Sequence, residues 1–284
     1  MSVLIAESGS SKTDWRWIRP DGTPVELSTR GINPSLEDLQ ALGQDPMLEP
    51  LRDWTPDQVH FYGAGCADEQ VNKQMTAMLQ GLFPEAAVGV YSDLLAAARV
   101  LFGHKPGIAC ILGTGSNSCL YAEGKVQANV LSLGYLLGDE GGGVSIGKRL
   151  LKDYLRGNMP ADIAEHLRQT LQMDRAAIYE RIYRMPYPNR FLASMVTHVA
   201  EYRHTSYLQH LVEREFQAFF KQCIRAYPDY AAYSIGFVGS IAFHFSDALR
   251  AVAHAEGMTC EHIIHRPIDA LVDFHHSSHK DLTT

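Results

Sequence analysis

The feature that most constrains the fold of this chain is a pattern of apolar strand, small-residue turn and second strand that occurs twice. The first turn lies at residues 7–14 (ESGSSKTD) and the second at residues 113–118 (GTGSNS). Glycine lets backbone N–H groups approach an anion closely, and hydroxyl groups add donors. Taken singly, each turn is typical of an ordinary hairpin. The repetition predicts a duplicated core whose two turns face each other across a cleft and hold a polyphosphate.

Composition narrows the range of partners and locations. The chain has 284 residues, 46% of them hydrophobic, and a formal net charge of −7. The acidic balance argues against nucleic acid as a partner, and no apolar run is long enough to cross a membrane. The chain opens without the basic segment of a signal peptide, so we expect a cytoplasmic protein. We also expect a homodimer, because twofold dimers predominate among soluble oligomers.

Cysteine and histidine give no sign of a metal centre or of a disulfide framework. The five cysteines are an odd number, and no two of them form a Cys-x-x-Cys pair. This pattern argues against disulfides and against a zinc or iron–sulfur site built within one chain. The thirteen histidines show no ligand spacing that recurs with carboxylates, and we assign no function to His275 and His276 near the end of the chain.

A turn at residues 105–107 (KPG) marks the expected boundary between two domains. We expect a first domain over residues 1–106, which carries the first turn, and a second domain over residues 107–271, which carries the second turn. Apolar residues at helical spacing predict that residues 144–227 are mainly helical. The polar, histidine-rich segment 272–284 is either a frayed tail or a return of the chain onto the first domain.

Asp93 is the strongest catalytic candidate. It follows a predicted strand at residues 88–91 and precedes an alanine-rich helical segment at residues 93–102, with Ser92 in front of it. This position favours an ordinary helix N-cap, which is the usual role of an aspartate there. A carboxylate at a strand end beside bound phosphates would instead be placed to accept a proton from a hydroxyl nucleophile.

The segment at residues 133–143 (LGYLLGDEGGG) combines two carboxylates with five glycines just before a helix. One interpretation is a flexible turn with helix caps. So many glycines favour a second interpretation, in which a ligand approaches the backbone closely. Asp139 or Glu140 would then hold sugar hydroxyl groups, or a metal through water.

An apparent P-loop overlaps the end of this segment. Residues 142–148 fit the pattern Gly-x-x-x-x-Gly-Lys, but Arg149 stands where a P-loop has the serine or threonine that binds magnesium. The residues also run into a predicted helix from Val144 onward instead of forming a loop after a strand. We interpret the match as a coincidence.

Taken in order, these motifs resemble the BadF/BadG/BcrA/BcrD ATPase family, and within it the N-acetylglucosamine kinase-like members of the sugar kinase/Hsp70/actin superfamily. The motifs are the two turns, residues 31–34 (GINP), the Asp93 helix, residues 138–141 (GDEG) and residues 239–242 (GSIA). The resemblance spans nearly the whole chain, from Leu4 to about Phe274. It implies an α/β fold of the two-domain ribonuclease H-like (actin-like ATPase) type, with a duplicated core around an interdomain cleft.

The resemblance also implies roles for individual residues. The positions that match ATP-binding positions of the family are Gly9, Ser10, Ser11, Lys12, Thr13, Gly113, Thr114, Gly115, Gly239 and Ser240. Those that match sugar-binding positions are Asn33, Asp93, Ser116, Asn117, Gly134 and Asp139. Asp93 matches the catalytic base, which would take the proton from the sugar 6-hydroxyl as it attacks the γ-phosphate. Mg2+ would bridge the phosphates of ATP.

The chain departs from the family at Glu7. The family usually has aspartate at this position, where the carboxylate supports magnesium, commonly through water. A longer carboxylate would still reach, with a different geometry. The departure affects the expected turnover rate more than nucleotide binding. The alternative interpretation is that glutamate is tolerated here, at a position that does not contact the ligand directly.

Three functions follow from these patterns. The first is an ATP-dependent kinase of N-acetylglucosamine or a related amino sugar, such as N-acetylmuramic acid or glucosamine. The second is a non-catalytic sugar or nucleotide sensor, which the exchange at Glu7 supports. The third is an ATPase that activates a dehydratase through an iron–sulfur cluster between two subunits, for which the cysteines show no obvious placement.

Overall fold

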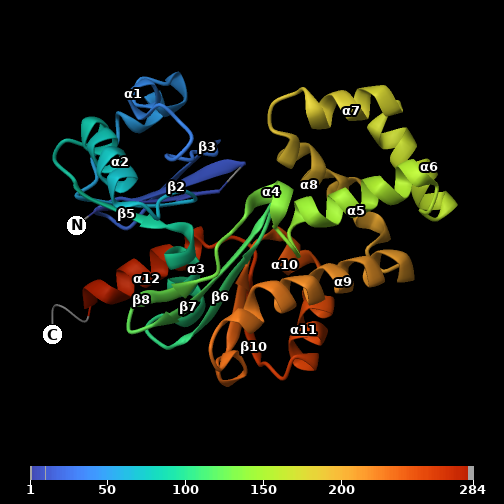
Figure 1. Ribbon diagram of the computed structural model, residues 1–284. Helices are drawn as coiled ribbons and strands as arrows, with labels where there is room; N and C mark the ends of the chain where they lie inside the picture. Colours follow the sequence, from blue (N-terminus) through green and yellow to red (C-terminus); the bar gives the residue numbers. More distant parts are fainter. Residues whose placement is uncertain (1, 10, 281–284) are drawn as a thin grey trace. The chain divides into compact units, whose positions relative to one another are not determined.

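The computed structural model describes residues 2–9 and 11–280, which form two compact units, each built around one five-stranded sheet (Figure 1). The first unit comprises the described residues of Met1–His104 and Arg266–Thr284, and the second comprises Lys105–His265. The chain re-enters the first unit at Arg266, a little before residue 272. The predicted α/β class with a duplicated core is confirmed.

The sheet of the first unit is mixed and has the strand order β3-β2-β1-β4-β5. Its strands are β1 (Val3–Ser8), β2 (Lys12–Ile18), β3 (Pro24–Arg30), β4 (Gln58–Gly63) and β5 (Ala87–Ser92). The first three strands pair antiparallel, whereas β1 with β4 and β4 with β5 pair in parallel. The central strand β1 is almost wholly buried, as its apolar run predicts.

The sheet of the second unit repeats this plan with the order β10-β9-β6-β7-β8. Its strands are β6 (Gly107–Leu112), β7 (Ser116–Ala122), β8 (Lys125–Asn129), β9 (Ile235–Val238) and β10 (Cys260–Ile264). Strands β6, β7 and β8 pair antiparallel, and β9 joins β6 in parallel. Each glycine turn therefore joins the central strand of its sheet to the antiparallel neighbour.

The helices of the first unit are α1 (Leu39–Leu42), the 3-10 helix η1 (Pro46–Leu51), α2 (Glu69–Leu82), α3 (Asp93–Phe102) and α12 (Ile268–Lys280). Helix α12 packs beside α3 and β1 (Figure 1). Its Ile268 and Leu271 are buried with residues of β1, and the buried His275 hydrogen-bonds the hydroxyl of Tyr62 at 2.8 Å. The alternative of a frayed tail is therefore wrong for residues 272–276.

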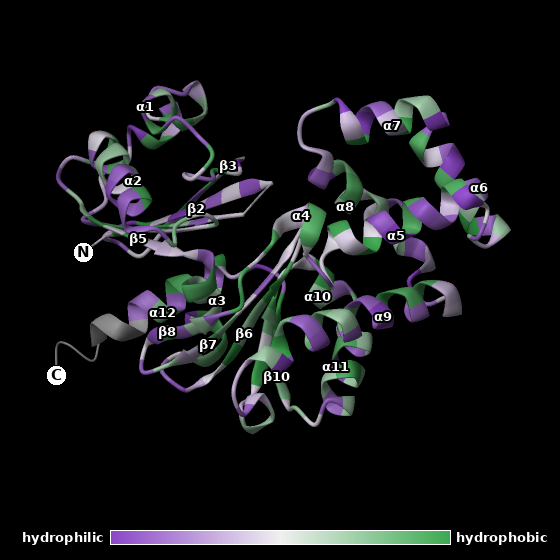
Figure 2. Cartoon of the chain, viewed as in Figure 1, coloured by the Kyte–Doolittle hydropathy of each residue, from purple (hydrophilic) through white to green (hydrophobic). Residues whose placement is uncertain are grey.

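Residues between β8 and β9 are mainly helical, as predicted. They form α4 (Gly134–Leu137), α5 (Gly143–Arg156), α6 (Ala161–Leu171), α7 (Arg175–Tyr183), α8 (Pro188–His198), η2 (Ala200–Tyr202), α9 (Ser206–Gln222), η3 (Ile224–Ala226) and η4 (Tyr230–Ala232). Helices α10 (Ser240–His244) and α11 (Ser246–Ala255) follow β9. Helix α9 is amphipathic (Figure 2), and its buried face carries leucine, valine and three phenylalanines.

The apparent P-loop lies in helix α5, so interpreting it as a coincidence is confirmed. Gly142 is the N-cap of α5, and Gly147 and Lys148 lie within the helix. A Cβ atom on Gly147 would collide with the carbonyl oxygen of Leu192 in α8. Gly147 therefore serves the close packing of α5 on α8.

Within residues 2–9 and 11–280, no helix combines the length and apolar character that a membrane span requires.

Candidate functional site

The first turn joins β1 to β2 and is closed by a hydrogen bond from the Gly9 N–H to the Lys12 carbonyl at 3.0 Å. Ser10 lies outside the described residues. Ser11 is exposed, and the Lys12 ammonium forms an ion pair with Asp14 at 2.5 Å. Among the described residues, the turn thus offers the exposed Ser11 hydroxyl and the Lys12 ammonium.

Thr13 does not present its hydroxyl to a ligand as the resemblance implied. Its side chain is fully buried. The Thr13 hydroxyl hydrogen-bonds Ser8 Oγ at 2.7 Å and the Arg30 carbonyl at 3.1 Å. Ser8 Oγ in turn accepts the N–H of Ile32 at 2.9 Å. Thr13 therefore fastens the first turn to the segment that leads to Asn33.

Glu7 stands near the end of β1 in a strongly negative environment. Burial, followed by the charges of Asp14 and Asp93, raises its pKa to about 7, against the opposing charge of Lys12. Its carboxyl group accepts no hydrogen bond from the described residues. Burial would also raise the pKa of Asp14, but hydrogen bonds from Lys12 and Ser28 hold it below the usual value.

Asp93 is not the N-cap of helix α3, which corrects the position-based interpretation. The cap is Ser92, whose Oγ accepts the N–H of Leu95 at 3.2 Å. Asp93 is the first helical residue, and its Oδ1 accepts the N–H of Leu94 at 2.9 Å. Burial raises the pKa of Asp93 to about 6. A carboxyl group that titrates near neutral pH can act as a general base.

Asn33 is held by its neighbours so that its amide NH2 has no partner among the described residues. The Asn33 N–H donates to Glu37 Oε1 at 2.9 Å, and Asn33 Oδ1 accepts the N–H of Ser35 at 3.1 Å. Glu37 is fixed by Arg30 at 2.6 Å. A Cβ atom on Gly65 would collide with Asn33 Oδ1. Sequence reasoning missed both residues: Gly65 is distant in the chain, and Glu37, although only four positions from Asn33, belongs to no motif that singled it out.

The second turn is held against the start of helix α5. The N–H of Gly143 donates to the Gly113 carbonyl, and the N–H of Val144 donates to the Thr114 carbonyl, both at 2.8 Å. Across the described residues, the Thr114 hydroxyl and the amides of Thr114 and Gly115 have no hydrogen-bond partner. These groups remain as donors for an anion.

Two glycines near this turn allow close packing within the protein itself. A Cβ atom on Gly142 would lie 2.6 Å from the carbonyl carbon of Gly115. Gly239, at a φ of +123°, would likewise place a Cβ atom against the Leu112 carbonyl. Gly142 and Gly239 let segments of the protein approach each other, whereas a Cβ atom on Gly134 would have no neighbour within 4 Å, so the close approach of a ligand to this segment stays a prediction.

Asp139 lies beside the second turn in the left-handed conformation, at a φ of +63°. Its Oδ1 accepts the N–H of Ser116 at 3.1 Å. Burial raises the pKa of Asp139 against the opposing hydrogen bond from Ser116 and charge of Lys148. Asn117 Oδ1 accepts a hydrogen bond from Asn129 Nδ2 at 3.0 Å, and the Asn117 NH2 has no partner among the described residues. Ser116, Asn117 and Asp139 are thus brought together.

Two other predicted residues have separate positions in the second unit. Gly134 begins α4 at a φ of +70°. Ser240 is exposed at the start of α10, directly after Gly239, whose N–H donates to the Ile264 carbonyl at 2.9 Å. Gly239 therefore joins β10 to the strand that ends in the second turn.

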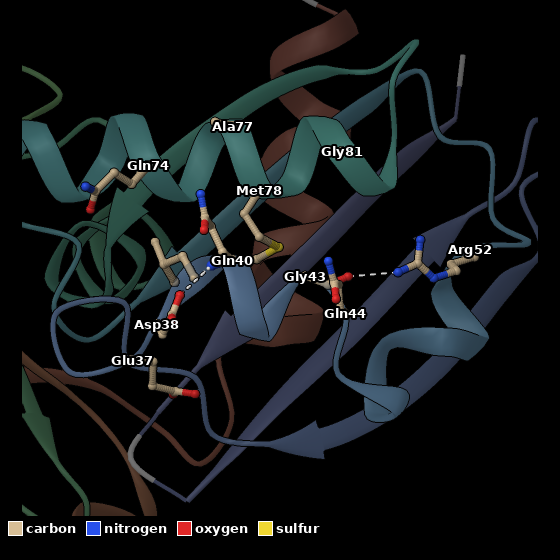
Figure 3. Close-up of a pocket in the computed structure, with 11 residues that line it drawn as sticks. Glu37, Asp38, Gln40, Gly43, Gln44, Arg52, Gln74, Ala77, Met78 and Gly81 are labelled. Carbon is tan, nitrogen blue, oxygen red and sulfur yellow. Dashed lines mark hydrogen bonds between the residues drawn. The ribbon is translucent and has the colours of Figure 1, made fainter.

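A cavity of about 770 Å³ lies in the first unit between α1, α2 and the residue after η1 (Figure 3). Gln40, Gln74 and Met78 point toward it, and Arg52 donates to the Gly43 carbonyl at 2.8 Å at one end. None of the predicted site residues lines this cavity.

Known structures resemble this chain over nearly its whole length. A putative N-acetylglucosamine kinase from Porphyromonas gingivalis is 36% identical with a TM-score of 0.91, and the match covers 98% of this chain and 99% of that one. A putative N-acetylglucosamine kinase from Chromobacterium violaceum is 18% identical with a TM-score of 0.74 over 96% and 98% of the two chains. A ROK family glucokinase from Streptomyces griseus is 13% identical with a TM-score of 0.52 over 93% of each chain.

The last two likenesses show the fold alone. No protein-family model matches the chain, and no curated protein matches it. The resemblance to the BadF/BadG/BcrA/BcrD family in particular stays a prediction. The Porphyromonas gingivalis match is high in identity and covers almost all of both chains. The chain therefore belongs to the family of the Porphyromonas gingivalis putative N-acetylglucosamine kinase and has the actin-like ATPase fold of sugar kinases.

Proposed function

We propose that the protein is an ATP-dependent kinase that phosphorylates the 6-hydroxyl of N-acetylglucosamine or a related amino sugar, with Asp93 as the general base. The observation that carries the proposal is the state of Asp93. Its carboxyl group is free of the capping role, and its pKa is raised to about 6 by burial. The name of the Porphyromonas gingivalis relative supports the substrate class.

In the proposed reaction, the sugar 6-oxygen forms a bond with the γ-phosphorus of ATP. The bond between that phosphorus and the β,γ-bridging oxygen breaks, and ADP leaves with the electron pair. The proton of the sugar hydroxyl passes to the carboxylate of Asp93. Because the enzyme has little covalent chemistry to perform, positioning and charge stabilisation provide most of the catalysis.

The phosphates of ATP would be held by donors from both glycine turns. In the first unit these would be the exposed Ser11 hydroxyl and the Lys12 ammonium. In the second unit the donors would be the amides of Thr114 and Gly115 and the Thr114 hydroxyl. Thr13 would act indirectly by holding the first turn in shape. Gly239 and Ser240 would lie near the adenosine.

The sugar would be bound by complementary donors and acceptors. Asn33 and Asn117 each offer an amide NH2 group without a partner among the described residues. Asp139 offers the carboxylate oxygen that Ser116 does not use, which would accept hydrogen bonds from sugar hydroxyl groups. Charge-assisted hydrogen bonds of this kind are stronger than neutral ones. Ser116 and Gly134 would line the same subsite.

The environment of Glu7 fits a divalent cation, because the carboxyl groups of Asp14 and Asp93 add to the negative charge of Glu7 and are opposed there by Lys12. No group of three or more candidate ligand side chains that could hold a metal occurs in residues 2–9 and 11–280. Mg2+ would therefore be held mainly by phosphate and water oxygens, with Glu7 beside it. When bound with ATP, it would offset charge on the phosphate oxygens.

The proposal is tested by ADP release in the presence of Mg2+ and ATP. The panel of acceptors is N-acetylglucosamine, N-acetylmuramic acid, glucosamine, N-acetylmannosamine and glucose. We expect one amino sugar to stimulate release, and Asp93→Asn to lower kcat by about 100-fold to 10,000-fold. Asp53→Asn, at an exposed carboxylate of the same unit, is the matched control.

If the protein is instead a sensor, the same purified protein should bind its ligands without turnover. Calorimetry would then detect binding of sugar and of ATP, while no member of the panel stimulates ADP release. That outcome would overturn the proposed kinase. The glutamate at position 7, where the family usually has aspartate, would then explain the lack of turnover.

A further inference from the structure

Helix α4 carries part of the proposed sugar site but has little apolar anchorage. None of its residues is buried. The leucines in and around it are exposed by 75%, 54%, 74% and 77% at Leu131, Leu133, Leu136 and Leu137. Tyr135 is only partly buried against the core of the second unit. Burial therefore does little to fix the position of α4, and polar contacts must do so.

The backbone at both ends of α4 has unusual conformations. Gly134 is the first residue of the helical turn, at a φ of +70°, and Asp139 follows the turn at a φ of +63°. Between them, α4 is closed by the hydrogen bond from the Gly138 N–H to the Gly134 carbonyl at 2.8 Å. Gly134 and Asp139, two of the residues assigned to the sugar, thus lie at the two ends of a single helical turn.

Lys148 reaches this turn from a well-anchored helix. Its Nζ donates to the carbonyl oxygen of Tyr135 in the middle of α4 at 2.8 Å. Helix α5, which carries Lys148, is joined to the second turn by the N–H groups of Gly143 and Val144. The same helix packs closely on α8 at Gly147. Lys148 therefore connects α4, which has no buried residue, to a helix that packs closely on α8.

Lys148 is also the cation that faces Asp139. The charged neighbours of Asp139 are Lys148 and Glu140, and these two act in opposite directions on its pKa. The Cys223 thiol from the end of α9 lies near both carboxyl groups. Loss of Lys148 would leave Asp139 with burial and a second carboxylate, both of which favour its protonated form.

We propose that Lys148 is a positioning residue, which holds α4 through Tyr135 and keeps Gly134 and Asp139 in place for the sugar. This inference rests on the proposed function for its catalytic consequences, but not for the anchorage of α4. The inference assigns a role to Lys148, the lysine of the apparent P-loop. This lysine lies within helix α5 and not in a phosphate-binding loop.

The first test measures anchorage without sugar or nucleotide. Hydrogen exchange of the Gly138 amide is compared in the native chain, Lys148→Met and Lys152→Met. Lys152 is one turn further along α5 and exposed, and it is the matched control. We expect exchange to quicken about tenfold or more in Lys148→Met alone. Equal exchange in all three proteins would overturn the anchorage.

The second test measures the consequence for the sugar. We expect Lys148→Met to raise the sugar KM about tenfold while kcat stays within about twofold, and Lys148→Arg to restore most of the affinity. Sugar binding should weaken below a certain pH, where Asp139 becomes protonated. This lower pH limit should be higher in Lys148→Met, because Asp139 stays protonated up to a higher pH. A purely structural role would not shift this limit.

The two tests separate the proposals. If the native protein phosphorylates no amino sugar, the proposed function fails and the exchange experiment still decides whether Lys148 holds α4. If the native protein is active but Lys148→Met leaves both KM and its pH limit unchanged, the positioning role is overturned while the kinase stands.

Discussion

A Cβ atom on Gly115 would lie 2.6 Å from Oδ1 of Asp139, so the second turn accommodates this carboxylate only because residue 115 is glycine. The Asp139 side chain in turn accepts the N–H of Ser116, the next residue along the turn. The glycine, the carboxylate and the turn are therefore one packed arrangement. A change at any one of them should disturb the other two.

Gly115→Ala should displace Asp139 and weaken sugar binding. The added methyl group meets the carboxylate, and overpacking of this kind costs about 1–3 kcal/mol of unfolding free energy. Urea unfolding and the sugar KM measure the two effects. Gly113→Ala is the control for stability, because a Cβ atom there has no neighbour within 4 Å. Equal unfolding midpoints for the two variants would contradict the prediction.

The rate of the proposed reaction should fall on the acidic side with a midpoint near pH 6. Asp93 must be ionised to accept the sugar proton, and burial raises its pKa to about 6. The rate should therefore rise as pH increases through that value and then level off. A profile of kcat/KM against pH measures this fall in rate on the acidic side. A rate that is flat from pH 5 to pH 8 would remove Asp93 from the role of base.

Glu7→Gln should stabilise the protein at alkaline pH and leave it unchanged in acid. The folded pKa of Glu7 is raised from 4.5 to about 7. Between these values the folded state binds more protons than the unfolded state, so stability is lost as pH rises and the loss is complete above about 7. Allowing for solvent screening, the gain at pH 8 should be about 1–3 kcal/mol.

Urea unfolding at pH 4.5 and pH 8 measures the effect of Glu7→Gln. Glu85→Gln, at an exposed carboxylate of the same unit, should change stability at neither pH. The same gain at both pH values would show that the effect is not electrostatic.

Glu37→Ala should raise the sugar KM about tenfold with little change in kcat. The Glu37 carboxylate accepts the N–H of Asn33 and pairs with Arg30, so its loss frees the turn that presents the Asn33 amide. Glu37→Gln keeps an acceptor for Asn33 and should be milder. Steady-state kinetics measure both variants. Glu49→Ala, which removes an exposed pair with Arg52, is the control that should leave KM unchanged.

Local patterns in the sequence were sufficient for the main features of the fold. The two strand-turn-strand repeats, the helix that begins beside Asp93 and the helical region after β8 all follow from hydrophobic periodicity and turn residues. These signals are local, because each depends on neighbours within a few positions of the chain. They carry no information about which segments pack against one another.

Only the tertiary structure decided how the site residues are used. The Thr13 hydroxyl donates to the Arg30 carbonyl, and the Glu37 carboxylate accepts the N–H of Asn33. The lack of a side chain at Gly142 allows it to pack closely against Gly115. Sequence reasoning also favoured Asp93 as the cap, because serine and aspartate are nearly equal cap formers and stand side by side there. The contacts of Thr13 with Arg30 and of Gly142 with Gly115 join segments distant in the chain, whereas the choice of cap and the Asn33–Glu37 contact depend on side-chain geometry that residue type alone does not specify.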